Sequence, residues 1–223
     1  MKIIAKIHTP FKEKFGIPRQ SGITDDLLSK IVFEPEYRRR EALVGLDGFS
    51  HLWLIWQFSE AKREEWSPTV RPPRLGGNKR MGVFATRSPF RPNPIGLSSV
   101  KLCKIEYTES EGPVIYVSGA DMLDGTPIYD IKPYLSYTDS HTDATGGFAD
   151  EVLDYKIEVV FPENLLEKID TGERKAVITM LENDPRPSYK KESEKEYGMK
   201  FSHYEIFFCV KEGILFVNDV KLI

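Results

Sequence analysis

Two segments concentrate the side chains that could carry out chemistry, and the first is basic. Residues 79–97, KRMGVFATRSPFRPNPIGL, hold three arginines and three prolines and contain no acidic residue. Proline fixes φ and removes a backbone donor, so this stretch can be neither helix interior nor central strand. A stiff loop that carries arginines is typical of a site that recognises a polyanion or a carboxylate.

The second segment, residues 119–134 (GADMLDGTPIYDIKPY), is rich in aspartate. Asp124 begins the turn signal D-G-T-P, in which aspartate bonds its own backbone and glycine takes positive φ. Asp121 and Asp130 lie among apolar residues, where a carboxylate requires partners such as arginines. Each could belong to a structural ion pair or to a functional site, and the sequence leaves both interpretations open.

Other sites are weaker or absent in the sequence. Arg19 and Gln20 follow Pro18 and offer a guanidinium and an amide at a bend, although an ordinary surface turn is the alternative. The four histidines are scattered without metal-ligand spacing, so we expect no metal site. The signatures of Rossmann, P-loop, zincin and serine-hydrolase sites do not occur.

Charge is distributed unevenly along the chain. The net charge is −3, but residues 1–101 hold 18 Lys and Arg against 10 Asp and Glu, and the remainder holds 13 against 24. Residues 66–101 contain seven basic residues and no acidic one, interleaved with Trp66, Phe84 and Phe90. Aromatic side chains can stack on unpaired bases, so this pattern favours an RNA-binding surface over a merely solvated face.

The chain shows no membrane or export signal. No apolar run approaches the ~20 residues that a spanning helix requires. The N-terminal stretch lacks a long apolar segment and a small-residue cleavage site. We therefore predict a cytoplasmic protein without a membrane partner.

The elements that must position these residues are mainly short strands. Strands are predicted at 2–8, 29–33, 51–58, 81–86, 95–107 and 114–118, with a short helix within 35–46. Connections rich in Pro and Gly, without alternating βα units, indicate a small antiparallel or mixed β-barrel.

A small polar stretch at 140–151 marks a predicted boundary between two domains, 1–145 and 150–223. The second domain is predicted to be small and α+β, with a strand at 155–161, one helix or two short helices broken at Gly172 over 162–181, and a hairpin formed by 204–210 and 214–217. The charged run 189–198 is predicted to be a solvated loop.

Taken in order, several motifs resemble the TsaA/TrmO family: IHTPFKEKFGIPRQ, GFSHLWLIWQF, the arginine- and proline-rich segment, DMLDGTPIYDIKPY and NDPRPSY. The resemblance covers residues 3–137 and resumes at 183–189. It implies a non-Rossmann, β-barrel tRNA methyltransferase that uses S-adenosylmethionine. The implied product is an N6-methylated N6-threonylcarbamoyladenosine beside the anticodon of threonine tRNA, and the family's members are homodimers with cofactor sites near the subunit interface.

The resemblance also implies the cofactor contacts of this chain. They fall on Arg19, Gln20, Ser59, Glu60, Arg87, Leu97, Gly119, Ala120 and Asp121. Some family members carry His-Gln where this chain has Ser59-Glu60, so this contact departs from the family pattern. An arginine on the cofactor carboxylate, and Asp121 on its ammonium or ribose, would satisfy the charges of S-adenosylmethionine.

Methylation of N6 requires a proton acceptor, because the N6 lone pair of the ureido group is delocalised. Asp121, Asp130 and Tyr134 are the candidates, and the sequence does not choose among them. On charge grounds the RNA contacts are predicted to be Arg71, Arg74, Lys79, Arg80 and Arg91.

Three alternatives remain at this point. The chain could be a methyltransferase of the same fold acting on another substrate. It could be a binding module for RNA or S-adenosylmethionine that lacks catalysis. It could also be an interaction protein in which residues 51–58 form an interface strand.

Overall fold

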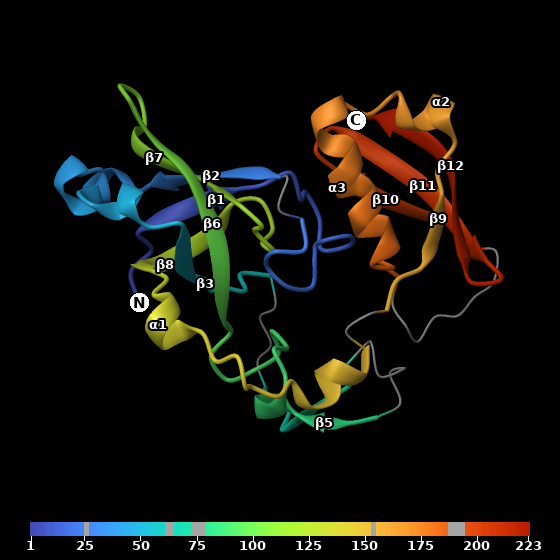
Figure 1. Ribbon diagram of the computed structural model, residues 1–223, viewed down its shortest axis with the longest axis horizontal. Helices are drawn as coiled ribbons and strands as arrows, with labels where there is room; N and C mark the ends of the chain where they lie inside the picture. The colour runs from blue at the N-terminus through green and yellow to red at the C-terminus, as the bar shows by residue number, and fades with distance from the viewer. Residues whose placement is uncertain (25–26, 61–64, 73–78, 153–154, 187–194) are drawn as a thin grey trace.

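A closed β-barrel forms the first part of the molecule (Figure 1). The computed structural model describes residues 1–24, 27–60, 65–72, 79–152, 155–186 and 195–223. Neighbouring strands follow the order β1-β2-β7-β6-β3-β8, and each neighbouring pair is antiparallel. The strands are β1 (Ala5–His8), β2 (Leu28–Phe33), β3 (His51–Gln57), β6 (Ile95–Thr108), β7 (Gly112–Ser118) and β8 (Thr126–Pro133). The barrel confirms the mainly β fold class.

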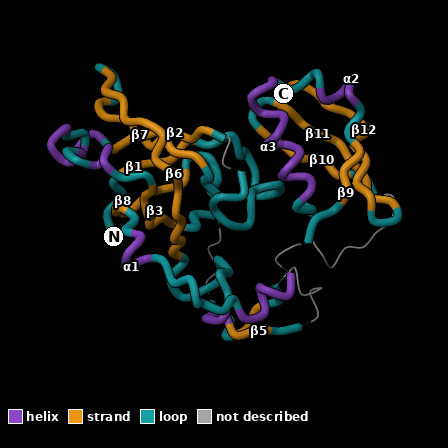
Figure 2. The backbone as a smooth tube through the Cα atoms, in the orientation of Figure 1, coloured by secondary structure: helices purple, strands orange, loops and turns teal. Residues whose placement is uncertain are grey.

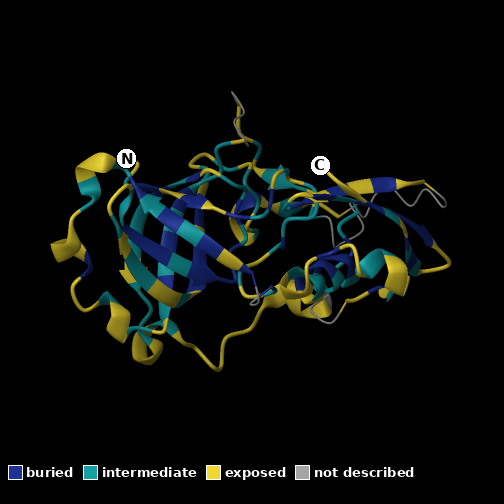
Figure 3. Ribbon diagram, turned by 90° about the horizontal axis from the view of Figure 1, so that it is seen from above, coloured by how far each residue is buried: buried dark blue, intermediate teal, exposed yellow. Residues whose placement is uncertain are grey.

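Strand β3 shows how the barrel separates its two faces. Its residues alternate between buried and half-buried, although the sequence run HLWLIWQ is almost continuously apolar. Leu52, Leu54 and Trp56 point into the core, while Trp53 and Ile55 lie on the outer face. The same alternation runs along the neighbouring strands (Figure 3). The prediction of a strand was right, but only every second residue is buried because side chains alternate across a sheet.

Two local predictions were wrong in type or extent. The helix expected within 35–46 is replaced by short 3-10 turns, η1 (Pro35–Tyr37), η2 (Arg40–Leu43) and η3 (Leu46–Gly48). Gly45, at φ +83°, interrupts helical geometry there. The strand expected at 81–86 is only β5 (Met81–Gly82), which pairs with β4 (Thr69–Val70) before η5 (Val83–Ala85).

A four-stranded sheet forms the C-terminal part, in the order β10-β11-β12-β9. Its strands are β9 (Glu158–Val160), β10 (Tyr197–Phe201), β11 (Tyr204–Lys211) and β12 (Ile214–Leu222), with β9 parallel to β12. Helices α2 (Glu163–Leu166) and α3 (Thr171–Glu182) precede β10, and the short α1 (Ser136–Asp139) and η6 (Gly147–Val152) connect the two parts. Helix is confined to short segments (Figure 2). The end of the predicted loop 189–198 belongs to β10.

The N-terminal loop, residues 9–24, lies between the barrel and the C-terminal sheet (Figure 1). Phe11 is buried in the same core as α3 and the C-terminal strands, with its ring 6.1 Å from that of Phe201. Phe15 stacks on Tyr197 at 6.2 Å. The loop that follows β1 is therefore anchored on the C-terminal sheet. The predicted domain boundary between 145 and 150 stays a prediction.

Candidate functional site

A hydrogen-bonded chain joins the barrel interior to the aspartate segment. The indole Nε1 of Trp56 donates to Ser98 Oγ at 2.9 Å, and Ser98 Oγ donates to Asp121 Oδ1 at 2.6 Å. Trp56 comes from β3 and Ser98 from β6, and both point inward. Asp121 follows β7, where Gly119 at φ +80° turns the chain. The strand register therefore brings three distant sequence segments to one carboxylate.

The pKa of Asp121 is raised above its usual range. Burial is the main cause, because a carboxylate loses solvation when it is removed from water. The Ser98 hydroxyl, backbone N–H groups and the positive charge of Arg87 favour the charged form and offset part of this effect. A carboxylate with a raised pKa is a better proton acceptor than an exposed one.

Arginine and amide groups from two loops meet beside this carboxylate. The guanidinium of Arg87 donates to Gln20 Oε1, and Gln20 Nε2 donates to the carbonyl of Arg19 at 2.6 Å. Gly22 N donates to the carbonyl of Gly119 at 2.9 Å. The N-terminal loop is thus fastened both to the arginine loop and to the aspartate segment.

The C-terminal part contributes a turn that contacts Arg19. Arg19 Nη2 donates to the carbonyl of Asp184 at 3.2 Å. The buried carboxylate of Asp184 accepts two bonds from the Arg186 guanidinium, at 2.8 and 2.9 Å, and one from Tyr155 at 3.1 Å. Burial raises the pKa of Asp184, but Arg186 outweighs it, and the pKa is lowered overall. Sequence reasoning noted NDPRPSY only as part of a resemblance and did not identify this support.

Ser59 and Glu60 follow β3 and approach the same loops. Phe58 N donates to the carbonyl of Pro94 at 2.9 Å, which ties this segment to the end of the proline-rich loop. Lys14 Nζ donates to the Glu60 carbonyl at 2.7 Å and lies 3.8 Å from its carboxylate. The structure therefore brings these two residues close to the N-terminal and arginine loops.

Leu97 and Asp130 lie on the outer face of the barrel instead. Leu97 stands opposite Ile55, which in turn pairs with Asp130, and Leu97 is 57% exposed. Asp130 Oδ2 lies 3.2 Å from Lys132 Nζ. Because Asp121 bonds to an inward-facing serine, Asp130 is on the other side of the barrel wall.

Tyr134 lies beside the start of β3, whereas Ser59 and Glu60 follow the end of that strand. Its backbone N–H donates to the carbonyl of His51 at 3.0 Å, and its ring lies 5.6 Å from that of Trp53. Of the three candidate proton acceptors, only Asp121 lies among the predicted cofactor residues.

The candidate RNA contacts are mostly exposed. Arg71, Lys79 and Arg80 are exposed, and Arg80 Nη1 donates to Thr69 Oγ1 at 3.3 Å. Arg91 is half-buried and donates to the carbonyl of Thr86 at 3.0 Å. Arg74 lies outside the described residues.

Two aromatic side chains accompany these basic groups. Trp66 is 52% exposed and Phe84 72% exposed, and their ring centroids are 6.1 Å apart. Exposed, adjacent rings are suited to stacking on an unpaired base.

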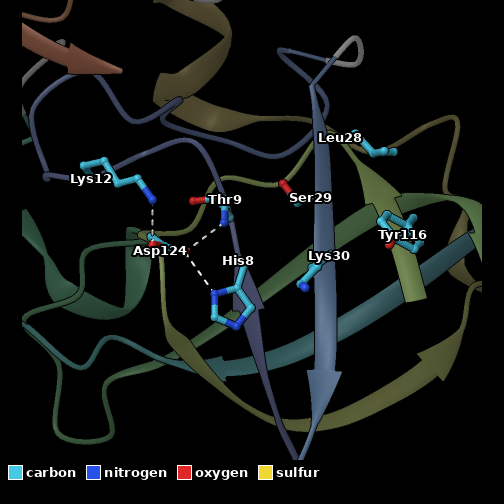
Figure 4. A pocket seen from close by; sticks show the side chains of 8 residues that line it. All are labelled: His8, Thr9, Lys12, Leu28, Ser29, Lys30, Tyr116 and Asp124. Atoms are coloured by element: carbon cyan, nitrogen blue, oxygen red, sulfur yellow. Dashed lines mark hydrogen bonds and ion pairs between the residues drawn. The ribbon is translucent and has the colours of Figure 1, made fainter. Parts of the chain in front are cut away.

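A shallow hollow of about 410 Å³ lies elsewhere, at the end of β1 and beside β2 and β7 (Figure 4). Asp124 occupies its centre, where it accepts from Lys12 at 2.8 Å and from the Thr9 N–H at 3.2 Å and lies 3.4 Å from His8. The predicted turn is present, with Gly125 at φ +76°, but the Asp124 carboxylate bonds Thr9 and Lys12 of the N-terminal segment instead of its own backbone. No predicted site residue lines the hollow.

Within the described ranges, no cluster of three or more His, Cys, Asp or Glu side chains could hold a metal ion. Among the described helices, none has the length and apolar character needed to span a bilayer.

Comparisons with known proteins bear on both parts of the chain. Residues 6–140 match the family model of the tRNA-methyltransferase O N-terminal domain, and residues 154–223 match that of the TrmO C-terminal domain. The tRNA (adenine(37)-N6)-methyltransferase of Escherichia coli K12 is 38% identical over 218 residues, which cover 94% of this chain and 92% of that protein.

Two further relatives come from Pseudomonas aeruginosa. A protein whose name assigns it to the S-adenosylmethionine-dependent methyltransferases is 40% identical over 88% of this chain and 86% of its own. A crystal structure of TrmO superposes with a TM-score of 0.78 at 32% identity, covering 99% of this chain and 95% of that one.

Proposed function

This chain belongs to the tRNA-methyltransferase O family, and we propose that it transfers a methyl group from S-adenosylmethionine to N6 of adenine 37 in tRNA. One observation carries the proposal to the residue level. The half-buried Asp121 carboxylate, Arg87 and Gln20 converge from segments far apart in the sequence. Such a convergence offers both a charge-matched cofactor site and a proton acceptor.

The described side chains fit S-adenosylmethionine. The ligand has a carboxylate at one end, which Arg19 or Arg87 can bind as a guanidinium fork. Leu97, exposed on the outer face of the barrel, and the buried Gly119 and Ala120 are proposed contacts on the resemblance alone. When bound, the cofactor supplies a methyl group on a sulfonium sulfur, which is released as a neutral thioether. Ser59 and Glu60 remain proposed contacts through their backbone, because this chain lacks the His-Gln pair of some relatives.

We assign the proton acceptor to Asp121. The N6–H bond must break as the N6–methyl bond forms, and the proton then goes to the Asp121 carboxylate. Asp121 suits this role because it is half-buried, which raises its pKa, and because it adjoins Arg87. Asp130 is paired with Lys132 on the outer face, and Tyr134 packs against Trp53, so neither has comparable surroundings.

The finer parts of the proposal rest on the resemblance. The substrate nucleoside is N6-threonylcarbamoyladenosine in threonine tRNA, and the enzyme works in the cytoplasm. It is a homodimer, and exposed Ile95 and Leu97 on the outer face of β6 give apolar surface for a second copy. Residues 1–145 form the catalytic domain, and residues 150–223 form a separate one that supports Arg19 through the turn at Asp184.

Nucleoside mass spectrometry of threonine tRNA tests the activity. Incubation with the protein and S-adenosylmethionine should add one methyl group to N6-threonylcarbamoyladenosine, and omission of either should abolish the product. Methylation of another nucleoside would identify a different substrate. Cofactor binding without any product would establish a non-catalytic module and reject the proposal.

The Asp121→Asn variant tests the proton acceptor separately. Because Asp121 is also a proposed cofactor contact, the variant should bind S-adenosylmethionine more weakly in calorimetry, while single-turnover methylation at saturating cofactor falls about 100-fold or more, as expected for loss of a general base. Asp130→Asn is the matched control and should retain its rate. A fully active Asp121→Asn enzyme would reject this assignment and leave the activity itself intact.

The basic surface should govern tRNA affinity through its salt dependence. Lys79→Gln combined with Arg80→Gln should weaken binding and reduce the slope of log K against log salt by about 2, because each phosphate contact contributes ~0.9. Lys211→Gln, at an exposed turn of the C-terminal sheet, is the control and should leave the slope unchanged. An unaltered slope in the double variant would show that the RNA does not contact Lys79 or Arg80.

A further inference from the structure

We propose that Ser98 and Trp56 are positioning residues that hold the Asp121 carboxylate in the orientation in which it accepts the N6 proton. This inference rests on the proposed function and deepens it, because it names the groups behind the proton acceptor. Neither residue stood out in the sequence, where Trp56 is one of several apolar residues in its strand and Ser98 one of two adjacent serines.

The direction of the hydrogen-bonded chain follows from the groups themselves. An indole N–H can only donate, so Trp56 occupies a lone pair of Ser98 Oγ. The serine hydroxyl has one proton, and the acceptor that the structure provides for it is Asp121 Oδ1, at 2.6 Å. The Ser98 hydroxyl therefore fixes one carboxylate oxygen of Asp121, and Trp56 fixes that hydroxyl, so the barrel sets the orientation of the proton acceptor.

The barrel holds both donors rigidly. Trp56 is 5% exposed and Ser98 2%, and the Trp56 ring lies 4.2 Å from that of Phe58. Trp56 pairs with Gly96 across β3 and β6, and the missing side chain of Gly96 makes room for the indole. Ser98 stands two residues further along the same inner face of β6. Buried donors fixed on strands keep a carboxylate in one orientation better than loop residues can.

The pair also adjusts the acidity of the base. The groups that face Asp121 are Ser98 from β6, Arg87 from the preceding loop and backbone N–H groups that include that of Ser21. Burial raises the pKa of Asp121, and the Ser98 bond is the strongest opposing influence. Removing the hydroxyl should raise the pKa further. Asp121 must be ionised to accept a proton, so the acidic limb of the pH–rate profile should then move to higher pH.

The experiment uses Ser98→Ala and Trp56→Phe in the full-length protein. Their matched controls are Ser99→Ala, the neighbouring outward serine, and Trp53→Phe, whose indole donates at 2.8 Å to Asp139 on the outer face. Carbon-13 NMR of aspartate-labelled, cofactor-free protein follows the Asp121 carboxyl directly, since its resonance is the one missing in Asp121→Asn. Single-turnover methylation across pH provides the second measurement.

Ser98→Ala should raise the titration midpoint of Asp121 and slow methylation about tenfold at neutral pH, with recovery at higher pH. Trp56→Phe should shift the Asp121 titration and the methylation rate in the same direction but by less, because the Ser98 hydroxyl remains. Ser98→Thr should restore both measurements, and the controls should match wild type. Calorimetry should show unchanged cofactor affinity in Ser98→Ala.

An unshifted Asp121 titration in Ser98→Ala would overturn the inference, and so would a rate loss that is equal at every pH. Either result leaves the proposed function standing as long as Asp121→Asn is inactive. Failure of the wild-type protein to methylate tRNA would instead reject the proposed function.

Discussion

At the scale of single residues, Gly96 determines where the Trp56 indole can lie. A Cβ built on Gly96 would fall 2.2 Å from Trp56 Cε2 and 2.4 Å from Cζ2, well inside van der Waals contact. The ring is buried and packed against Phe58, so it cannot move aside without disturbing the core. One methyl group is therefore enough to separate Trp56 from Ser98.

Gly96→Ala should destabilise the protein by about 1–3 kcal/mol, as overpacked cores do. Urea unfolding measures this loss. Gly82→Ala is the matched control, because a Cβ there would meet no atom within 4 Å, and its midpoint should match wild type. If Gly96→Ala unfolds at the wild-type midpoint, the core around Trp56 is looser than the barrel geometry indicates.

At the scale of elements, the turn between β11 and β12 illustrates how strand pairing constrains a loop. Lys211 pairs with Ile214 across a two-residue turn, so Glu212 and Gly213 both adopt positive φ, at 49° and 83°. Such turns match the twist of an antiparallel pair, but they favour Asn followed by Gly. Glutamate is therefore a poor choice at the first position.

Glu212→Asn should stabilise the protein by about 0.5 kcal/mol, because asparagine tolerates the left-handed region more readily. Gly213→Ala should instead destabilise the protein, since alanine is strained at a φ of 83°. Thermal unfolding of both variants gives the comparison. A loss of stability in Glu212→Asn would contradict this account of the turn.

At the scale of the whole molecule, Asp184 connects the C-terminal part to the loop that carries Arg19. Its carboxylate binds Arg186 and Tyr155, and its carbonyl accepts from Arg19. Burial and Arg186 act on its pKa in opposite directions, and the balance lowers it. A lowered folded-state pKa contributes stability above the unfolded value of about 4, and that contribution disappears as pH falls through the folded-state pKa.

Asp184→Asn should therefore cost about 2 kcal/mol at neutral pH, and the difference from wild type should shrink below about pH 4. Urea unfolding at several pH values measures both effects. Asp219→Asn removes an exposed pair with Lys168 and should change little. A difference between Asp184→Asn and wild type that persists at low pH would exclude ionisation as its cause.

Much of the fold is encoded in local patterns. Short apolar runs rich in β-formers predicted five of the six barrel strands, and breakers marked most of their ends. Three strands were not predicted: β4 lies in a proline-rich segment, β8 lies in the aspartate-rich segment, and β10 starts inside a charged run. The helix expected at 35–46 failed because apolar spacing alone cannot distinguish an α-helix from successive 3-10 turns.

Part of the candidate site could likewise be predicted from local sequence, and part depends on the tertiary structure. Composition and motif order were sufficient to identify the arginine loop, the aspartate segment and the family, because these signals are contiguous in the chain. The choice of Asp121 over Asp130 depends on which face of the barrel each carboxylate meets, and that follows from long-range strand register. Ser98 and Trp56 are ordinary core residues until β3 and β6 pair. Contacts between distant segments arise only when the chain folds, so local sequence carries no record of them.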